Sequence, residues 1–192
     1  MTESNHAGTG KAAPLEPGLD ERLFVALRTR WHPRPLERAL VLLSMTGNWG
    51  LFWVGLAALI WLLRWSWGTG FAMAAAVFIF LVPLVYITLG VNYLVKVMLH
   101  RERPDPGNEE LRPLVRVPSS LSFPSSHAAM SFAAAGVLTY FYPQLFALFY
   151  GLALVMSWSR VYVGVHYPSD VVAGTAIGLI MGGMAVLFLN WV

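Results

Sequence analysis

Long hydrophobic runs, separated by short polar segments, make up most of the chain. Asp, Glu, Lys and Arg are absent from four of these runs, residues 39–63, 65–95, 117–159 and 171–192. A helix needs about 20 mostly apolar residues to cross a bilayer, so each run can hold a span. The third run can hold two spans, broken near Tyr142 and Pro143. The pattern predicts an all-α, multi-pass transmembrane helical bundle of five to six spans.

The predicted spans cover residues 51–63, 71–95, 124–142, 145–158 and 171–191. Tryptophan lies near several of their ends, as the aromatic belt at a membrane surface requires. Residues 39–45 are apolar but too short to cross alone, and whether they form part of a sixth span is open. The sequence Gly-Asn-Trp-Gly at 47–50 predicts a turn before the first crossing.

The N-terminal region differs from the rest in composition. Residues 1–18 are rich in Gly, Ala, Pro and polar types, which predicts a disordered tail, and they lack the pattern of a cleavable signal peptide. Over residues 19–31, apolar side chains recur at helical spacing among charged ones. This predicts an amphipathic helix lying on the membrane surface. The remaining length allows a single membrane-embedded domain, residues 19–192.

Composition agrees with this class of protein. The chain is 57% hydrophobic and 12% charged, with a mean hydropathy of +0.59. Cysteine is absent, which excludes disulfides, thiolate catalysis and Cys-bound metals. A net charge of +3 is ordinary for a membrane protein and gives no reason to expect a nucleic-acid partner.

Three polar clusters border the predicted spans: residues 96–104, 123–127 and 159–170. Following the chain back and forth across the membrane places all three on one face. Charge at the edge of a span is costly unless something compensates it, so the clusters indicate an anionic ligand. We infer that this ligand is a phosphate carried by a lipid.

The first two clusters each allow two interpretations. Lys96 and Arg103, about two helical turns apart, could hold phosphate oxygens, but cations here are also typical of loops that face anionic headgroups. Pro124 at a first helical position leaves the following amides open to an anion, and Ser125 and Ser126 add hydroxyl donors. Serines at a helix start are equally typical of caps.

The third cluster places His166 four residues before Asp170. The carboxylate could fix one ring nitrogen and leave the other as a nucleophile or base. The alternative is a solvated loop in which Asp170 complements the dipole of the last helix.

Taken together, Lys-x6-Arg-Pro (96–104), Pro-Ser-x-His (124–127) and Ser-Arg-x5-His-x3-Asp (159–170) resemble the type 2 phosphatidic acid phosphatase superfamily. The resemblance covers roughly residues 50–190 in order and spacing. It departs at Ser126, where the usual pattern has Gly. A small side chain there keeps the backbone amide available, although it could narrow the pocket.

The resemblance implies a role for each matched residue. His166 would be the nucleophile that takes the phosphoryl group, oriented by Asp170, and His127 would protonate the leaving oxygen. The phosphate would be held by Lys96, Arg103, Ser125, the amide of Ser126, and Arg160. Water would then hydrolyse the phosphohistidine. Cations rather than a metal supply the charge that phosphoryl transfer needs, so no metal and no other cofactor is expected.

The favoured function is therefore an integral-membrane lipid phosphatase whose partners are a lipid phosphate substrate and membrane lipids. Polyprenyl diphosphates, polyprenyl-phosphate sugar phosphates, phosphatidylglycerol phosphate and phosphatidic acid all fit the resemblance. A transporter or channel that uses the buried Arg and His residues as an anion site is the alternative. A vanadium haloperoxidase shares the anion pocket, but those enzymes are soluble.

The distribution of positive charge favours one orientation in a bacterial inner membrane. The N-terminal segment and every active-site loop share a face that carries all Lys and Arg except Arg64. The positive-inside rule assigns this face to the cytoplasm. Many bacterial relatives are thought to act on the outer face, so the two indications disagree, and we favour the cytoplasmic side.

Overall fold

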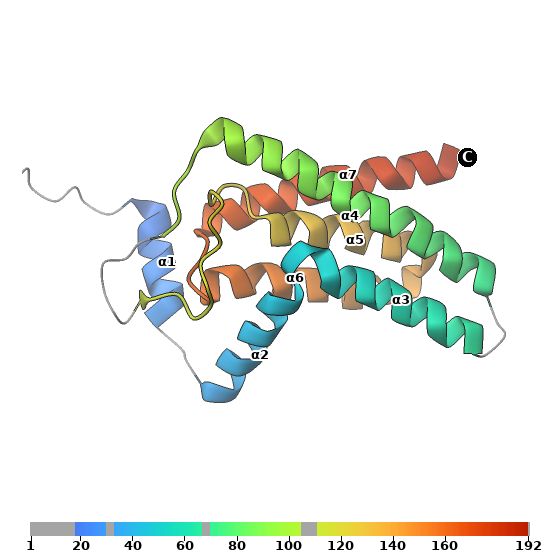
Figure 1. Ribbon diagram of the computed structural model, residues 1–192, viewed down its shortest axis with the longest axis horizontal. Coiled ribbons are helices and arrows are strands. Elements are labelled where there is room, and N and C mark those ends of the chain that lie inside the picture. Colours follow the sequence, from blue (N-terminus) through green and yellow to red (C-terminus); the bar gives the residue numbers. More distant parts are fainter. Residues whose placement is uncertain (1–17, 30–32, 67–69, 105–110, 192) are drawn as a thin grey trace, which may run out of the picture.

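A computed structural model describes residues 18–29, 33–66, 70–104 and 111–191 (Figure 1). The predicted disordered tail therefore lies almost entirely outside the described residues, as does much of the loop over residues 105–117. Every regular element assigned within the described ranges is a helix, so the predicted all-α class is confirmed.

The helices follow one another along the chain with short connections. They are α1 (Leu19–Thr29), α2 (Arg34–Thr46), η1 (Asn48–Gly50), α3 (Leu51–Ser66), α4 (Phe71–Leu99), α5 (Ser126–Phe141), η3 (Pro143–Leu145), α6 (Phe146–Tyr162) and α7 (Pro168–Trp191). Helices α3 to α7 form an elongated bundle, and α1 and α2 lie at one end of it (Figure 1).

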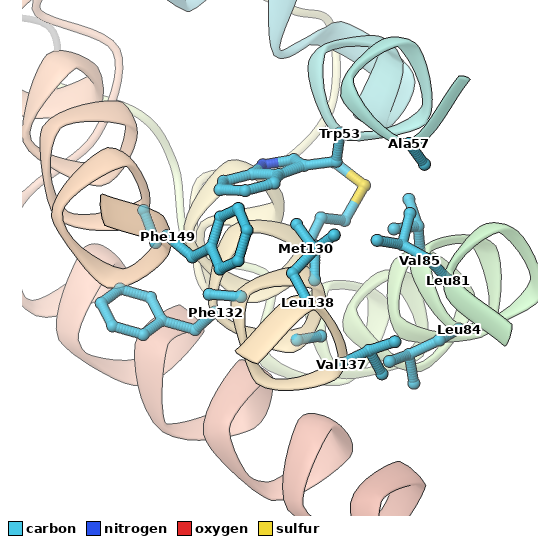
Figure 2. Close-up of a cluster of buried hydrophobic side chains, with 14 of the residues drawn as sticks. Trp53, Ala57, Leu81, Leu84, Val85, Met130, Phe132, Val137, Leu138 and Phe149 are labelled. Atoms are coloured by element: carbon cyan, nitrogen blue, oxygen red, sulfur yellow. The ribbon is translucent and has the colours of Figure 1, made fainter. Parts of the chain in front are cut away.

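Helix α5 occupies the middle of the bundle and packs against α4, α6 and α7. Most of its side chains are buried, and many are alanines, which let neighbouring helices approach closely. Larger residues of α3, α4 and α6 complete the core around it, among them Trp53, Val85 and Phe149 (Figure 2). The start of the central helix is thus surrounded by neighbouring elements.

Three segments are long and apolar enough to cross a membrane: α4, η3 with α6, and α7. A fourth is added if α2 and α3, which are bent by 68° at Gly47, form one broken span. The protein is thus a helical membrane protein, but the predicted count of five to six spans is not confirmed, because three or four segments meet the criterion within the described residues. Helix α5 has 16 residues, or about 24 Å, because its position inside the bundle does not require it to meet lipid along its full length.

One local prediction holds and two are wrong. The turn at residues 47–50 is present, and Trp49 there adopts a left-handed conformation with φ of 57°. Pro124 is not a first helical residue, because α5 begins at Ser126. Arg103 does not share a helix with Lys96, because α4 ends at Leu99 and His100 turns left-handed with φ of 49°.

Candidate active site

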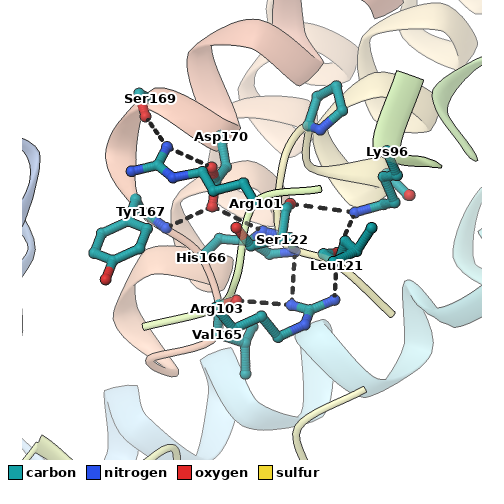
Figure 3. Close-up of polar contacts among 12 residues, drawn as sticks. Lys96, Arg101, Arg103, Leu121, Ser122, Val165, His166, Tyr167, Ser169 and Asp170 are labelled. Carbon is teal, nitrogen blue, oxygen red and sulfur yellow. Dashed lines mark hydrogen bonds and ion pairs between the residues drawn. The ribbon is translucent and has the colours of Figure 1, made fainter. Parts of the chain in front are cut away.

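The three polar clusters meet at the end of the bundle where α4 and α6 end and α5 and α7 begin. Figure 3 shows residues of the first and third clusters there. The connection between α4 and α5 folds over this end, and the short segment between α6 and α7 carries His166 into it. Six of the eight predicted site residues are at least 90% buried within the chain: Lys96, Ser125, His127, Arg160, His166 and Asp170.

Two contacts fix the proton of His166. Nδ1 of its ring lies 3.3 Å from Oδ2 of Asp170, and Nε2 lies 3.3 Å from Nη1 of Arg103. A guanidinium has only donors, so Nε2 accepts and carries a lone pair. The proton must then sit on Nδ1, where it is donated to the carboxylate. The geometry thus selects the tautomer in which Nε2 can act as a nucleophile.

The same ring is held in the neutral form. Burial lowers the pKa of His166 well below its usual range, and the nearby positive charges, led by that of Arg103, lower it further. A neutral imidazole is the form that can attack phosphorus.

Asp170 is fully buried at the first turn of α7 and accepts from several donors. The backbone N–H of Tyr167 donates to Oδ2 at 2.9 Å, and Arg101 Nη1 donates to Oδ1 at 2.8 Å. These contacts fix the carboxylate on both sides (Figure 3). The alternative of a solvated loop is therefore wrong, although Asp170 does lie in the first turn of α7 and accepts from the Tyr167 N–H just before it, as that alternative expected.

Lys96 and Arg103 are both turned inward. Lys96 Nζ donates to the carbonyls of Leu121 at 2.8 Å and Ser122 at 3.2 Å, and Arg103 donates to the carbonyls of Ser120 and Val165 at 2.8 and 2.7 Å. Since the carbonyls of the α4–α5 connection hold both cations beside His166, neither is a snorkelling residue in a loop.

Arg160 and His127 are linked through Ser44 of α2, a residue that the sequence interpretation missed. Arg160 Nη1 donates a short hydrogen bond to the Ser44 hydroxyl, and His127 Nε2 lies 3.1 Å from the Ser44 carbonyl. A carbonyl only accepts, so Nε2 of His127 carries a proton. The one available signal was a polar residue among the apolar residues of α2, four positions after the buried Leu40.

The start of α5 supplies further polar atoms. Ser125 occupies the N-cap position of α5, but its side chain makes no capping hydrogen bond, and its backbone N–H donates to the Asp170 carbonyl at 2.9 Å. Ser125 Oγ and Arg160 Nε are buried and have no hydrogen-bond partner among the described residues. Ser126 Oγ accepts from Asn92 Nδ2 at 2.8 Å. Asn92 was also missed, although it lies one helical turn before Lys96 on α4.

A cavity of about 1060 Å³ reaches this end of the bundle. Lys96, Ser126 and Arg160 line its polar part. His127 and His166 are not among the lining residues, and Arg103 contacts His166 Nε2 at 3.3 Å. Its apolar part follows α4 from Tyr86 to Tyr93, on the side where Trp49 also lies. The stretch from residue 86 to residue 96 corresponds to about 15 Å along a helix axis. The cavity thus joins buried cations to an apolar channel long enough for part of a hydrocarbon chain.

Within the described ranges, no group of three or more His, Asp or Glu side chains is arranged to hold a metal ion. The positive charge near His166 comes instead from Lys96, Arg103 and Arg160. Whether the reaction requires a metal remains a prediction to be tested by chelation.

Comparison with known proteins agrees with this arrangement. The family model of the PAP2 superfamily matches residues 65–192. The chain belongs to the PAP2 superfamily. Decaprenylphosphoryl-5-phosphoribose phosphatase from Mycobacterium tuberculosis is 37% identical over 101 residues, which cover 52% of this chain and 54% of the relative. The chain thus spans about half the length of this curated relative.

Solved structures show the same fold. A transmembrane PAP2-type phosphatidylglycerolphosphate phosphatase from Bacillus subtilis superposes with a TM-score of 0.69 at 24% identity, covering 90% of this chain and 85% of that one. A bacterial vanadium-dependent iodoperoxidase superposes with a TM-score of 0.74 at 17% identity, covering 92% of this chain and 51% of that one. The fold alone is therefore compatible with more than one chemistry.

Proposed function

We propose that the protein is an integral-membrane lipid phosphatase that works through a phosphohistidine intermediate. The observation that carries this proposal is the tautomer of His166, whose lone pair on Nε2 is surrounded by buried cations. Phosphoryl transfer needs an aligned nucleophile and positive charge around the equatorial phosphate oxygens, and this site offers both.

The phosphate would bind among Lys96, Arg103, Arg160, Ser125 and the backbone amide of Ser126. Burial makes each charged contact stronger than it would be in water. The unpartnered Ser125 Oγ and Arg160 Nε support this position, since buried polar atoms normally have a partner. Arg103 would give up its contact with His166 Nε2 and turn its guanidinium toward the phosphate oxygens.

The reaction would then proceed in two transfers. In the first, Nε2 of His166 attacks phosphorus, the bond from phosphorus to the lipid oxygen breaks, and His127 in its imidazolium form gives a proton to that oxygen and becomes neutral. In the second, water attacks the phosphohistidine, the phosphorus–nitrogen bond breaks, and His127 takes a proton from the water. Inorganic phosphate leaves and His166 is restored. To act in this way, His127 would exchange the Ser44 carbonyl for the leaving oxygen.

The cavity supports a lipid rather than a small soluble phosphate as the substrate. Its polar part would hold the headgroup, and its apolar part along α4 would hold the first segment of the chain. Arg116 and Ser119 line the same cavity and would contact a second phosphate or a sugar. Phosphatidic acid, phosphatidylglycerol phosphate, polyprenyl diphosphates and polyprenyl-phosphate sugar phosphates all remain candidate substrates.

The membrane setting follows from the same elements. We place the domain at residues 19–192 in a bacterial inner membrane, with α1 on the membrane surface. Leu19, Leu23 and Leu27 form an apolar stripe on α1 that is exposed in the isolated chain, and a lipid surface would cover it. The basic residues near the site favour the cytoplasmic face.

A transporter that uses the cluster as an anion site is the alternative function. Helix α4 contains no ionisable Asp, Glu, Arg or His and only one Lys, at its last turn. The polar groups gather at one end of the bundle, which does not support a conducting path through it. A peroxidase activity is supported only by the fold.

A panel of the four lipid classes, with released phosphate as the readout, tests the function. Wild-type protein should hydrolyse at least one of them, and His166→Ala should lose activity by several orders of magnitude. His100→Asn is a matched control, because His100 is exposed at the same end of the bundle and Asn tolerates its left-handed backbone. Retention of more than a few per cent of turnover by His166→Ala would rule out the proposed nucleophile.

Chelation tests the absence of a metal. EDTA should leave activity nearly unchanged, because Lys96, Arg103 and Arg160 supply the positive charge. Orthovanadate, which adopts the five-coordinate geometry of the transition state, should inhibit. Activity that is lost with EDTA and restored by Mg²⁺ would contradict the mechanism.

A further inference from the structure

One stripe of α1 docks onto the segment that carries His166. Asp20, Phe24 and Arg28 follow at intervals of four residues, so their side chains lie on one side of the helix. The ring of Phe24 meets that of Tyr167 edge to face, with centroids 5.7 Å apart. Phe24 is 2% exposed and Arg28 is 4% exposed. The helix therefore has a defined position against this segment.

Asp20 ties the start of α1 to the start of α7. Its Oδ1 accepts from the backbone N–H of Ser169 at 3.0 Å, and its Oδ2 accepts from the Ser169 hydroxyl. Burial raises the pKa of Asp20, but the hydrogen bonds from Ser169 and Arg101 lower it more, and the net shift is downward. Asp20 is accordingly a charged acceptor next to Asp170.

Arg101 connects the two carboxylates (Figure 3 shows its contacts with Ser169 and Asp170). Its Nη2 donates to Oδ2 of Asp20, and its Nη1 donates to Oδ1 of Asp170 at 2.8 Å. Its guanidinium also lies over the ring of Tyr167, 4.4 Å from the centroid. Planar forked donors suit this bridging position, which a lysine could fill only in part.

We propose that Asp20 and Arg101 are positioning residues that hold Asp170 in the orientation required to keep the proton of His166 on Nδ1. This inference rests on the proposed role of His166 as the nucleophile. Asp170 Oδ2 already serves Tyr167 and His166, so Arg101 supplies the charged donor to Oδ1. Without it, the buried carboxylate would turn toward other donors, and Nδ1 of His166 would lose its partner.

Contacts therefore run from Asp20 of α1 through Arg101 and Asp170 to the ring of His166. Asp20 directs its carboxylate to Ser169 and Arg101, and Arg101 directs its guanidinium to Asp20, Ser169 and Asp170, so both residues act behind Asp170 rather than on the phosphate. Their side chains are 25% and 33% exposed, and a partly solvated ion pair contributes little to the stability of a fold. Asp20→Asn should therefore fold, and Arg101→Lys keeps a positive charge beside the fully buried Asp170 should Arg101→Gln fail to fold. The folded variants should show a defect in turnover rather than in binding.

The test measures kcat and KM for Arg101→Gln, Arg101→Lys, Asp20→Asn and the Asp20→Asn/Arg101→Gln double variant. Arg101→Gln should lower kcat by about 10–100-fold with little change in KM, the range typical when a group behind a functional histidine is removed. Arg101→Lys should recover part of the loss, and Asp20→Asn should lose less. The double variant should be no worse than Arg101→Gln, because Asp20 acts through Arg101. Glu21→Gln is the matched control, since it removes a carboxylate from the exposed side of α1.

A second readout does not depend on turnover. In protein labelled with ¹⁵N-histidine, with the His166 signals assigned by comparison with His166→Gln, wild type should show one tautomer with its proton on Nδ1. Arg101→Gln should shift these signals toward a mixture of tautomers, and Glu21→Gln should not. If wild type hydrolyses no lipid phosphate, the proposed function fails, and the tautomer still decides the positioning role.

Three outcomes would overturn the inference. They are an unchanged kcat in Arg101→Gln, losses that multiply in the double variant, and unchanged His166 signals in Arg101→Gln. A fall in kcat with unchanged signals would assign Arg101 to general support of the fold instead.

Discussion

His127 illustrates how a single contact changes the interpretation of a residue. Its Nε2 proton points to the Ser44 carbonyl, and its ring packs against Gly47, where a Cβ would lie 2.6 Å from its Cδ2. His127 is thus held in place by α2 and Gly47, which precede the residues 65–192 that the family model matches. A role as general acid requires His127 to break its contact with the Ser44 carbonyl during the reaction.

His127 should accordingly matter in proportion to how poor the leaving group is. A lipid monophosphate expels an alkoxide and needs a proton, whereas p-nitrophenyl phosphate expels a stable anion. His127→Ala should lose a factor of about 10² to 10⁴ on the lipid, the usual contribution of general acid catalysis, and much less on the aryl ester. Initial rates on both substrates measure this, and His166→Ala, which should fail on both, is the comparison. Equal losses for His127→Ala would mean that it binds phosphate or holds α2.

At the scale of elements, the contact between α5 and α7 places the first turns of both helices beside the site. Gly174, Gly178 and Gly182 of α7 lie against backbone atoms of α5. A Cβ on Gly178 would overlap the carbonyl oxygen of Ala129 and lie 2.8 Å from Cβ of Phe132. The two backbones therefore approach too closely for any side chain at this position.

Gly178→Ala should destabilise the protein by about 1–3 kcal/mol, because the helices must separate to accept a methyl group. Thermal unfolding in detergent measures this. The matched control is Gly183→Ala on the same helix, where nothing lies within 4 Å of the added Cβ. That variant should be neutral or gain up to about 1 kcal/mol, since alanine favours a helix over glycine. Equal shifts for both variants would show that packing against α5 does not set the cost.

At the scale of the whole molecule, the site and the end of α7 lie at opposite ends of the bundle (Figure 1). The basic residues of α1, α2 and the α4–α5 connection are near the site. If this end faces the cytoplasm, as we propose, the end of α7 lies on the opposite, external face of the membrane.

Reporter proteins fused to the C-terminus should therefore indicate a position on the external face of the membrane. An alkaline phosphatase fusion, which needs an oxidising compartment, should be active, and a green fluorescent protein fusion should be dark. The reverse pattern would place the site on the outer face. The end of α3 and the start of α4 lie at the same end of the bundle as the end of α7 (Figure 1). Fusions made between α3 and α4 should therefore match the C-terminal result and provide a consistency check.

The sequence alone determined the helical class and the identity of the matched residues. In lipid, a helix is the main way for an apolar run to satisfy its backbone hydrogen bonds. The four-residue spacing places His166 just before α7 and Asp170 in its first turn, close enough to interact. The sequence did not determine where α5 begins, because Pro124 permits a helix start without requiring one. The Pro124 carbonyl instead accepts from Asn92 Nδ2.

Only the tertiary structure decided which groups hold the site in place. Asp20 meets Arg101 across 81 residues, Arg160 meets Ser44 across 116, and Asn92 meets Ser126 across 34. Such contacts depend on how helices pack, and the local pattern around a lone Asp, Ser or Asn is the same whether its side chain meets solvent or a partner. For this reason, local patterning identified the candidate site residues, whereas the orientation of His127 and His166 followed from contacts with other parts of the chain.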